Sequence, residues 1–166
     1  MIGARSSPFL KRFVNSVPLY PLALAAGAFA AGEAPEPEAW VEPLGRTKPT
    51  AGRFVARVVG RSMERRISDG AYCVFGHPVE GSRQGRIVVV EHRSISDPDT
   101  GGSYTVKRYE SEKVADPDGG WRHDQIRLLP DADAPGYEPI VLSPDAEVRV
   151  IAELIEVLPG MAASTE

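Results

Sequence analysis

Short β-rich runs separated by Gly, Pro and Asp are the feature that most restricts how this chain can fold. Val, Ile, Tyr and Phe are frequent in these runs, and such residues favour strands. Turn-forming residues bound each run, as expected for short strands joined by loops. The runs cover residues 54–59, 71–75, 86–92, 104–109 and 125–129. This spacing predicts an all-β domain.

Residues 148–157, VRVIAELIEV, fit both an alternating strand and a helix. The β-branched residues at the start of this run favour a strand. Two Asp- and Gly-rich segments, SDPDTGGS (96–103) and ADPDGGW (115–121), are typical of hairpin loops.

Length and charge limit the classes of function. A chain of 166 residues can build one ordinary domain with tails. Its 19 Lys and Arg against 23 Asp and Glu give a net charge of −4, so we expect no direct binding to nucleic acid. A single cysteine, Cys73, excludes an internal disulfide and fits a reducing, cytoplasmic compartment. The histidines His77, His92 and His123 are scattered, so no metal site and no cofactor is predicted.

The N-terminal part has a different composition from the β-rich part. We expect residues 1–16 to form a tail or one short helix, and 17–52 to hold an apolar segment followed by an extended, Pro- and Glu-rich connection that builds no core. The folded core is predicted at 53–158, with a C-terminal tail at 159–166. The apolar segment 17–32 is too short and too interrupted to span a bilayer. A cleaved signal peptide is an alternative reading, against which Pro18 and Pro21 interrupt the helix that such a leader forms.

Four short motifs follow one another in the β-rich part. They are Gly60-x-Ser62-Met63, Ile67-x-Asp69-Gly70, the run Gly85-x-Ile87-Val88-Val89, and Thr105-Val106-Lys107-Arg108. Each alone is weak, but in this order the series resembles the self-cleaving Ser/Lys peptidases of the LexA and UmuD type, over roughly residues 17–158. The resemblance implies a fold of short, strongly bent antiparallel strands, with Ser62 as nucleophile and Lys107 as general base.

The residue types suit this chemistry. A serine hydroxyl must pass its proton to a positioned base as it attacks. Lysine can accept that proton only when it is neutral, and burial among apolar side chains favours the neutral form. Lys107 lies in an apolar run, and Gly60 allows a sharp backbone turn before Ser62. The backbone N–H groups of Ser62 and Met63 are the expected oxyanion donors. We assign Asp69 only a turn.

The resemblance also implies that the chain cuts itself before a glycine upstream of the nucleophile. Ala26-Gly27 fits this role, and Ala31-Gly32 is the alternative. The alternative interpretation, without a cleavage site, is that LALAAGAFAA is a flexible apolar tether. By resemblance, an activated RecA filament would trigger cleavage in a damage or phage response, and the chain would form a homodimer.

Three departures from the family pattern stand out. The inserted SDPDTGGS loop lengthens the segment between nucleophile and base, which costs little free energy. Ala71 stands where the family usually has a second Asp. Residues 1–16 leave no room for a helix-turn-helix domain, so we expect this chain to differ from a complete LexA-like repressor. The rival functions are a membrane-associated signal peptidase, a peptidase-like interaction module without turnover, and a secreted β-domain.

Overall fold

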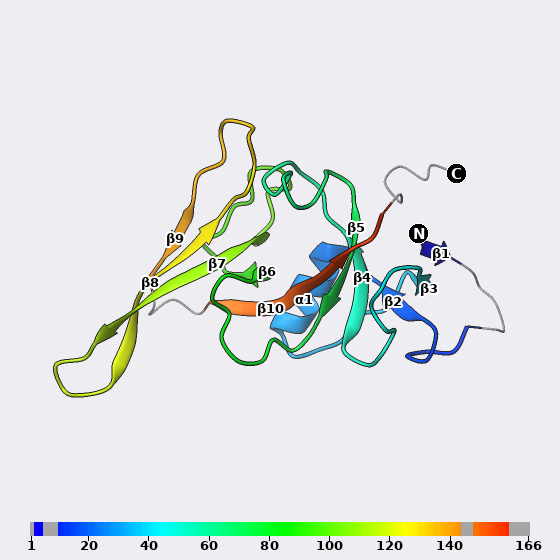
Figure 1. Ribbon diagram of the computed structural model, residues 1–166, viewed down its shortest axis with the longest axis horizontal. Coiled ribbons are helices and arrows are strands. Elements are labelled where there is room, and N and C mark those ends of the chain that lie inside the picture. The colour runs from blue at the N-terminus through cyan, green and yellow to red at the C-terminus, as the bar shows by residue number, and fades with distance from the viewer. Residues whose placement is uncertain (1, 5–9, 144–147, 160–166) are drawn as a thin grey trace.

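A computed structural model describes residues 2–4, 10–143 and 148–159 as a strongly twisted sheet with one helix against it (Figure 1). Within these residues the sheet has ten strands in the order β1-β3-β2-β4-β5-β10-β6-β7-β8-β9. The elements are β1 (Ile2–Ala4), β2 (Val17–Leu19), α1 (Leu22–Ala30), β3 (Ala39–Pro43), β4 (Arg53–Arg57), β5 (Tyr72–Gly76), β6 (Ile87–Glu91), β7 (Tyr104–Ala115), β8 (Trp121–Leu129), β9 (Ile140–Leu142) and β10 (Arg149–Val157). The all-β prediction is confirmed.

The strands predicted from the β-rich runs correspond to β4 through β8. The ambiguous run at the C-terminal end is a strand, β10, which lies between β5 and β6 and is antiparallel to both. Register shifts between Val150 and Ala152, and between Leu154 and Glu156, interrupt its pairing. Such bulges bend a strand and increase its twist. They explain why strict alternation is blurred in VRVIAELIEV.

The segment before residue 53 contributes more structure than expected. The expectation that residues 32–52 build no core is wrong at β3, where Val41 is fully buried and pairs with Val17 of β2. At the N-terminus, β1 pairs with β3, and Ser16 is fully buried, so the described residues 2–4 and 10–16 are not simply a tail. The Pro and Glu residues around AWVEP obscured this strand, because both are depleted in strands generally.

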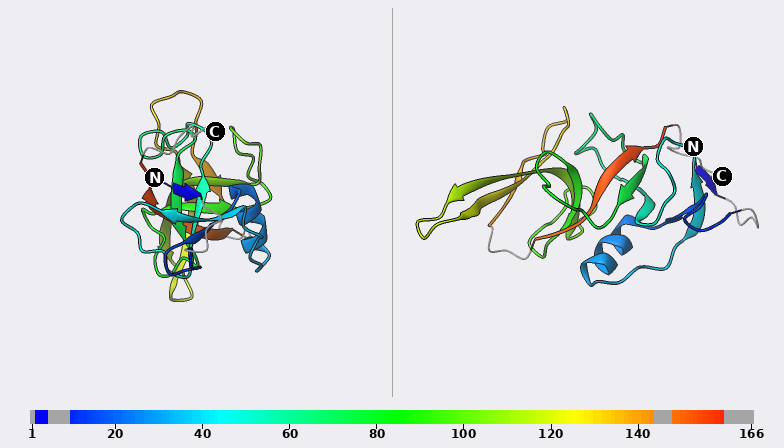
Figure 2. Two further views of the ribbon diagram at one scale, coloured as in Figure 1. Left: turned by 90° about the vertical axis from the view of Figure 1, so that its right-hand side faces the viewer. Right: turned by 60° about the horizontal axis from the view of Figure 1, so that its bottom comes forward.

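Helix α1 begins directly after Pro21, which occupies its N-cap. Proline is tolerated at a helix start because the first N–H groups have no partner inside the helix. Leu22, Ala25 and Ala26 form the buried stripe, and the helix packs against β6 and β10 on one face of the sheet (Figure 2). The tether interpretation of LALAAGAFAA is therefore wrong.

The main core lies between α1 and the central strands. It includes Phe54, Met63, Ile67, Phe75 and Val89, each almost fully buried. A second cluster around Val88, Val90 and Leu128 fills the opposite side, towards β8 and β9. The outer part of the β7–β8 hairpin projects from the body (Figure 1). Among the described residues, no helix is long and apolar enough to cross a membrane.

Candidate active site

Ser62 lies in the turn that follows β4. Gly60 enters this turn with φ of +110°, a conformation that L-residues with side chains rarely adopt. A Cβ atom at this position would also come within 2.3 Å of the Asp99 carboxylate. The Gly60 N–H donates to Asp69 Oδ1 at 2.8 Å, and the Ser62 carbonyl accepts from the Asp131 N–H at 2.8 Å. These contacts fix the turn, and Ser62 is buried, at 8% exposure.

Lys107 lies on β7, opposite Val88 of β6. It is 1% exposed, which is rare for a lysine. Its Nζ lies 2.8 Å from Ser62 Oγ, 2.6 Å from Thr105 Oγ1 and 3.2 Å from the Val106 carbonyl oxygen. The structure thus brings together the two residues that the motif series predicted as nucleophile and base.

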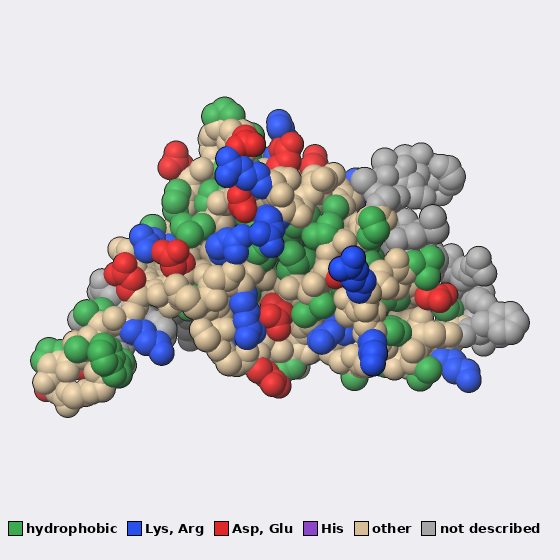
Figure 3. Space-filling view, in the orientation of Figure 1, with side chains coloured by type: hydrophobic (Ala, Val, Ile, Leu, Met, Phe, Trp, Pro, Cys, Tyr) green, Lys and Arg blue, Asp and Glu red, His purple; other side chains and the backbone are tan. Residues whose placement is uncertain are grey.

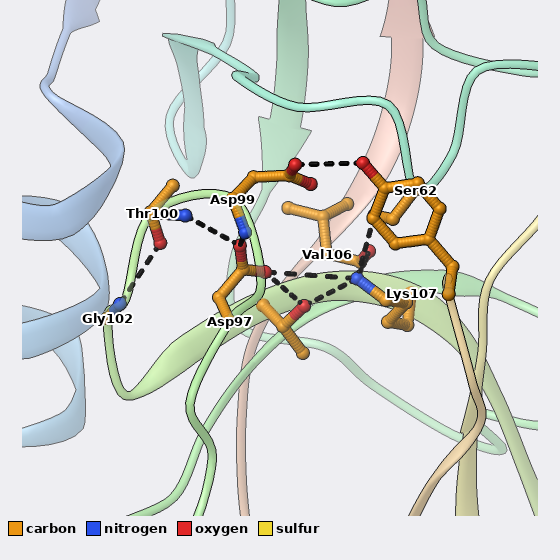
Figure 4. A network of polar contacts seen from close by, with 9 residues as sticks. Ser62, Asp97, Asp99, Thr100, Gly102, Val106 and Lys107 are labelled. Atoms are coloured by element: carbon orange, nitrogen blue, oxygen red, sulfur yellow. Dashed lines mark hydrogen bonds and ion pairs between the residues drawn. The ribbon is translucent and has the colours of Figure 1, made fainter. Parts of the chain in front are cut away.

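An acidic loop closes the other side of the lysine (Figure 4). Asp97, from the SDPDTGGS segment, is 8% exposed, and its Oδ2 lies 3.9 Å from Lys107 Nζ. The same oxygen accepts a hydrogen bond of 2.8 Å from Thr105 Oγ1. Tyr137 donates to Asp99 Oδ1 at 2.8 Å. The site therefore links the Lys107 amine, the Thr105 hydroxyl and the Asp97 carboxylate in one row of hydrogen bonds.

Two opposing effects act on the pKa of Lys107. Burial lowers it because desolvation disfavours the ammonium form, whereas the negative charges of Asp97 and Asp99 raise it. Burial dominates, so the pKa lies below the ordinary value of 10.5. This is the direction that a lysine base requires.

The three partners of Nζ suit the three N–H donors of an ammonium, and they can also be arranged around a neutral amine. A neutral amine has two N–H donors and one lone pair. Thr105 gives its own proton to Asp97, so its oxygen is left to accept an N–H of Lys107. The Val106 carbonyl can only accept. The lone pair of neutral Lys107 is then left for the Ser62 hydroxyl, which becomes the donor in that contact.

The N–H groups of Ser62 and Met63 remain candidates for oxyanion donors. Among the hydrogen bonds of the described residues, neither group donates to a protein atom. The Met63 carbonyl accepts from Arg66 and Ile67, which holds the turn, and the Met63 side chain is buried in the main core.

A pocket of about 530 Å³ opens beside Ser62. Its apolar wall includes Leu19, Tyr20, Leu22, Val58, Tyr104 and Val106. A second pocket, of about 670 Å³ and lined by residues such as Tyr109 and Ile126, includes neither Ser62 nor Lys107. Of these two pockets, the one of about 530 Å³ is suited to hold a peptide next to Ser62.

The predicted scissile bond is not presented in this pocket. Ala26 and Gly27 lie inside α1, where Ala26 is 1% exposed and the Gly27 carbonyl accepts from the Ala31 N–H at 3.2 Å. The alternative pair lies at the helix end, where Ala31 is the C-cap and Gly32 has φ of +78°. Both of these residues are exposed.

Thr105 and Asp97 were not identified from the sequence as parts of the site. Thr105 had a detectable signal, because residues two apart in a strand point to the same face and the hydroxyl must therefore lie beside Lys107. Asp97 had no such signal in the sequence, since Asp-Pro-Asp is typical of a turn. Arg61 and Arg65, which lie near Ser62 in the sequence, form surface ion pairs with Glu64 and Asp133. Within the described residues, no group of three or more His, Cys, Asp or Glu is placed to hold a metal ion.

Comparison with known families finds a match. The model of the family described as Peptidase S24-like matches residues 18–155, which include both Ser62 and Lys107. Comparison with individual curated proteins finds no match. Members of the matching family are typically serine peptidases.

Proposed function

The chain belongs to the peptidase S24-like family, and from this premise we propose that it is a serine peptidase that hydrolyses its own Ala26-Gly27 bond. Ser62 is the nucleophile and Lys107 its general base. The observation that carries the proposal is the 2.8 Å contact between Lys107 Nζ and Ser62 Oγ inside a buried site. A solvent-facing lysine beside a turn serine would show neither the burial nor the second and third partners of Nζ.

The reaction follows from the proton arrangement. Ser62 Oγ attacks the Ala26 carbonyl carbon while its proton passes to the lone pair of Lys107. The N–H groups of Ser62 and Met63 stabilise the resulting oxyanion. Lys107 then gives the proton to the Gly27 nitrogen as the C–N bond breaks. Water, deprotonated by the again neutral Lys107, hydrolyses the ester on Ser62 and releases residues 1–26 with a new carboxylate.

Cleavage at Ala26-Gly27 requires α1 to open. A helical backbone has its amide groups engaged in intrahelical hydrogen bonds, and the nucleophile must approach the carbonyl carbon to about 3–3.5 Å. We propose that the docked form is a minor conformation in which α1 unwinds and enters the pocket beside Ser62. Ala31-Gly32 needs less rearrangement, because it already lies beyond the helix.

The biological setting is proposed by resemblance to LexA and UmuD. We propose a cytoplasmic homodimer that cleaves itself in a DNA-damage or phage response, with an activated RecA filament stabilising the docked segment. Such a partner need not supply any catalytic group, because stabilising a minor conformation raises the rate in proportion to its population. The net charge of −4 supports a protein partner over direct contact with nucleic acid.

Burial of Ala26 supports a second candidate, a peptidase-like interaction module without turnover. Incubation of the purified protein at alkaline pH, followed by intact mass spectrometry, separates the two. The proposal predicts fragments 1–26 and 27–166. A break only after Ala31 would overturn the assignment of the bond, and an unchanged mass with an intact Ser62-Lys107 pair would favour the module.

A further inference from the structure

Asp97 stabilises its loop in the same way as Asp116 stabilises a second loop of similar sequence. Asp97 Oδ1 accepts the N–H of Asp99 at 2.9 Å, within SDPDTGGS. In the second Asp-Pro-Asp loop, Asp116 Oδ1 accepts the N–H of Asp118 at 3.1 Å. Each aspartate also donates its own N–H across its loop, Asp97 to Gly102 and Asp116 to Gly120. Turn formation therefore explains one carboxylate oxygen of each residue.

The second oxygen of Asp97 has no counterpart in this turn role. Asp97 Oδ2 accepts from Thr105 Oγ1 at 2.8 Å and faces Lys107 Nζ at 3.9 Å. The carboxylate is buried, whereas Asp116 is only half-buried. A buried carboxylate beside a lysine that must be neutral opposes catalysis by charge alone. Its presence there therefore points to a positional role that outweighs this cost.

We infer that Asp97 is a positioning residue for the reaction, which fixes the direction of the hydrogen bonds through Thr105 so that the lone pair of Lys107 faces Ser62. This inference rests on the proposed function. An ionised carboxylate can only accept, so Thr105 must donate to it and accept from Lys107. Without that constraint, the Thr105 hydroxyl can turn its proton towards Nζ and compete with Ser62 for the lone pair.

Asp97→Asn should reverse the direction of the hydrogen bonds that run from Lys107 through Thr105 to residue 97. In the variant, the amide oxygen is retained by the turn N–H groups of Asp99 and Thr100, and the NH₂ group faces Thr105. The Thr105 proton then points to Lys107. The substitution also removes a negative charge next to Nζ while leaving the charge of Asp99. Both changes favour the neutral amine, so the pKa of Lys107 falls further, although the base is then wrongly oriented.

The test combines a rate profile with a direct titration. For Asp97→Asn, we expect the pH midpoint of self-cleavage to move down and the plateau rate at high pH to fall about 10- to 100-fold, as for a misaligned reacting pair. Asp116→Asn is the matched control, since it changes the same turn position in the other loop, and it should keep the wild-type profile. Thermal unfolding of both variants checks that each is folded.

A titration of Lys107 does not depend on cleavage. In a Ser62→Ala background, the NMR signal of the Lys107 side chain followed against pH should give a lower midpoint with Asp97→Asn than without it, and an unchanged one with Asp116→Asn. This measurement tests the contact with Asp97 even if the wild-type chain never cleaves, an outcome that would instead refute the proposed function. A folded Asp97→Asn protein with the wild-type midpoint and plateau would overturn the inference. A lower plateau of the cleavage rate with an unchanged pH midpoint would mean that Asp97 acts only on the structure of its loop, and this result would also overturn the inference.

Discussion

Lys107 Nζ and Ser62 Oγ lie 2.8 Å apart although 45 residues separate them in the chain. The sheet positions both residues. The turn that contains Ser62 follows β4, and Lys107 lies on β7, which pairs with β6. The two residues meet at the edge of the main core, where Met63 and Val106 are buried. Folding itself thus provides both the geometry and the desolvation of the pair.

The burial of Lys107 should make stability depend on pH. Its pKa is lowered in the folded protein, chiefly by desolvation, so between that pKa and the ordinary value of 10.5 the unfolded chain binds more protons. The contribution of this group to the free energy of unfolding therefore rises with pH across this window. We predict that Lys107→Met, compared with the wild type by urea unfolding, loses stability relative to it as the pH is raised from 7 to 10. A difference that is constant over this range would contradict the lowered pKa.

Gly27 weakens α1 at the predicted cleavage site. It lies in the middle of the helix, and a Cβ added there meets no heavy atom within 4 Å. Gly27→Ala should therefore raise the free energy of unfolding by about 1 kcal/mol, measured by urea denaturation.

The same substitution should slow self-cleavage at this bond, because a more stable helix opens less often. The comparison variant for the alternative Ala31-Gly32 bond is Ala31→Gly, because Ala31 is the C-cap of α1 and lies outside the helix interior. If Gly27→Ala stabilises the protein but leaves the cleavage rate unchanged, opening of α1 does not limit the reaction.

Cys73 should be inert in the folded protein. It is fully buried on β5, and burial raises the pKa of its thiol to about 12. Thiolates are the reactive species, so a thiol reagent at pH 8 should label Cys73 only when the protein unfolds. Mass spectrometry after labelling with and without urea checks this. Rapid labelling of the native protein would show that the β4–β5 region opens readily.

Sequence analysis predicted the strands that carry the site better than it predicted the segment before residue 53. The runs around Val55, Val74 and Val89 are apolar and bounded by turn residues, so local pattern and burial agree. In contrast, α1 is Ala-rich and follows two prolines, and its helical state depends on packing against β6 and β10. Tertiary contacts of this kind decide the structure of short segments whose own preference is weak.

The candidate site shows the same division. Ser62 and Lys107 were predicted by motif order, and their contact depends on the order of the strands and on the turn that follows β4. Asp97 was read as a turn residue, which is correct for its Oδ1. Its second role depends on where the loop folds over β7, and no local pattern specifies that placement. Oxyanion donation by Ser62 and Met63, and the bond that is cut, stay predictions.

The proton on Lys107 gives the most direct test of the Ser/Lys mechanism. The self-cleavage rate of the wild-type chain, measured by intact mass against pH, should rise as Lys107 deprotonates and should level off at a midpoint below 10.5. Ser62→Ala removes the nucleophile and should abolish cleavage. Lys107→Arg keeps a positive charge but offers no accessible neutral base, so it should abolish cleavage as well while the protein remains folded. A Lys107→Arg protein that cleaves at the wild-type rate with the same pH profile would contradict the mechanism.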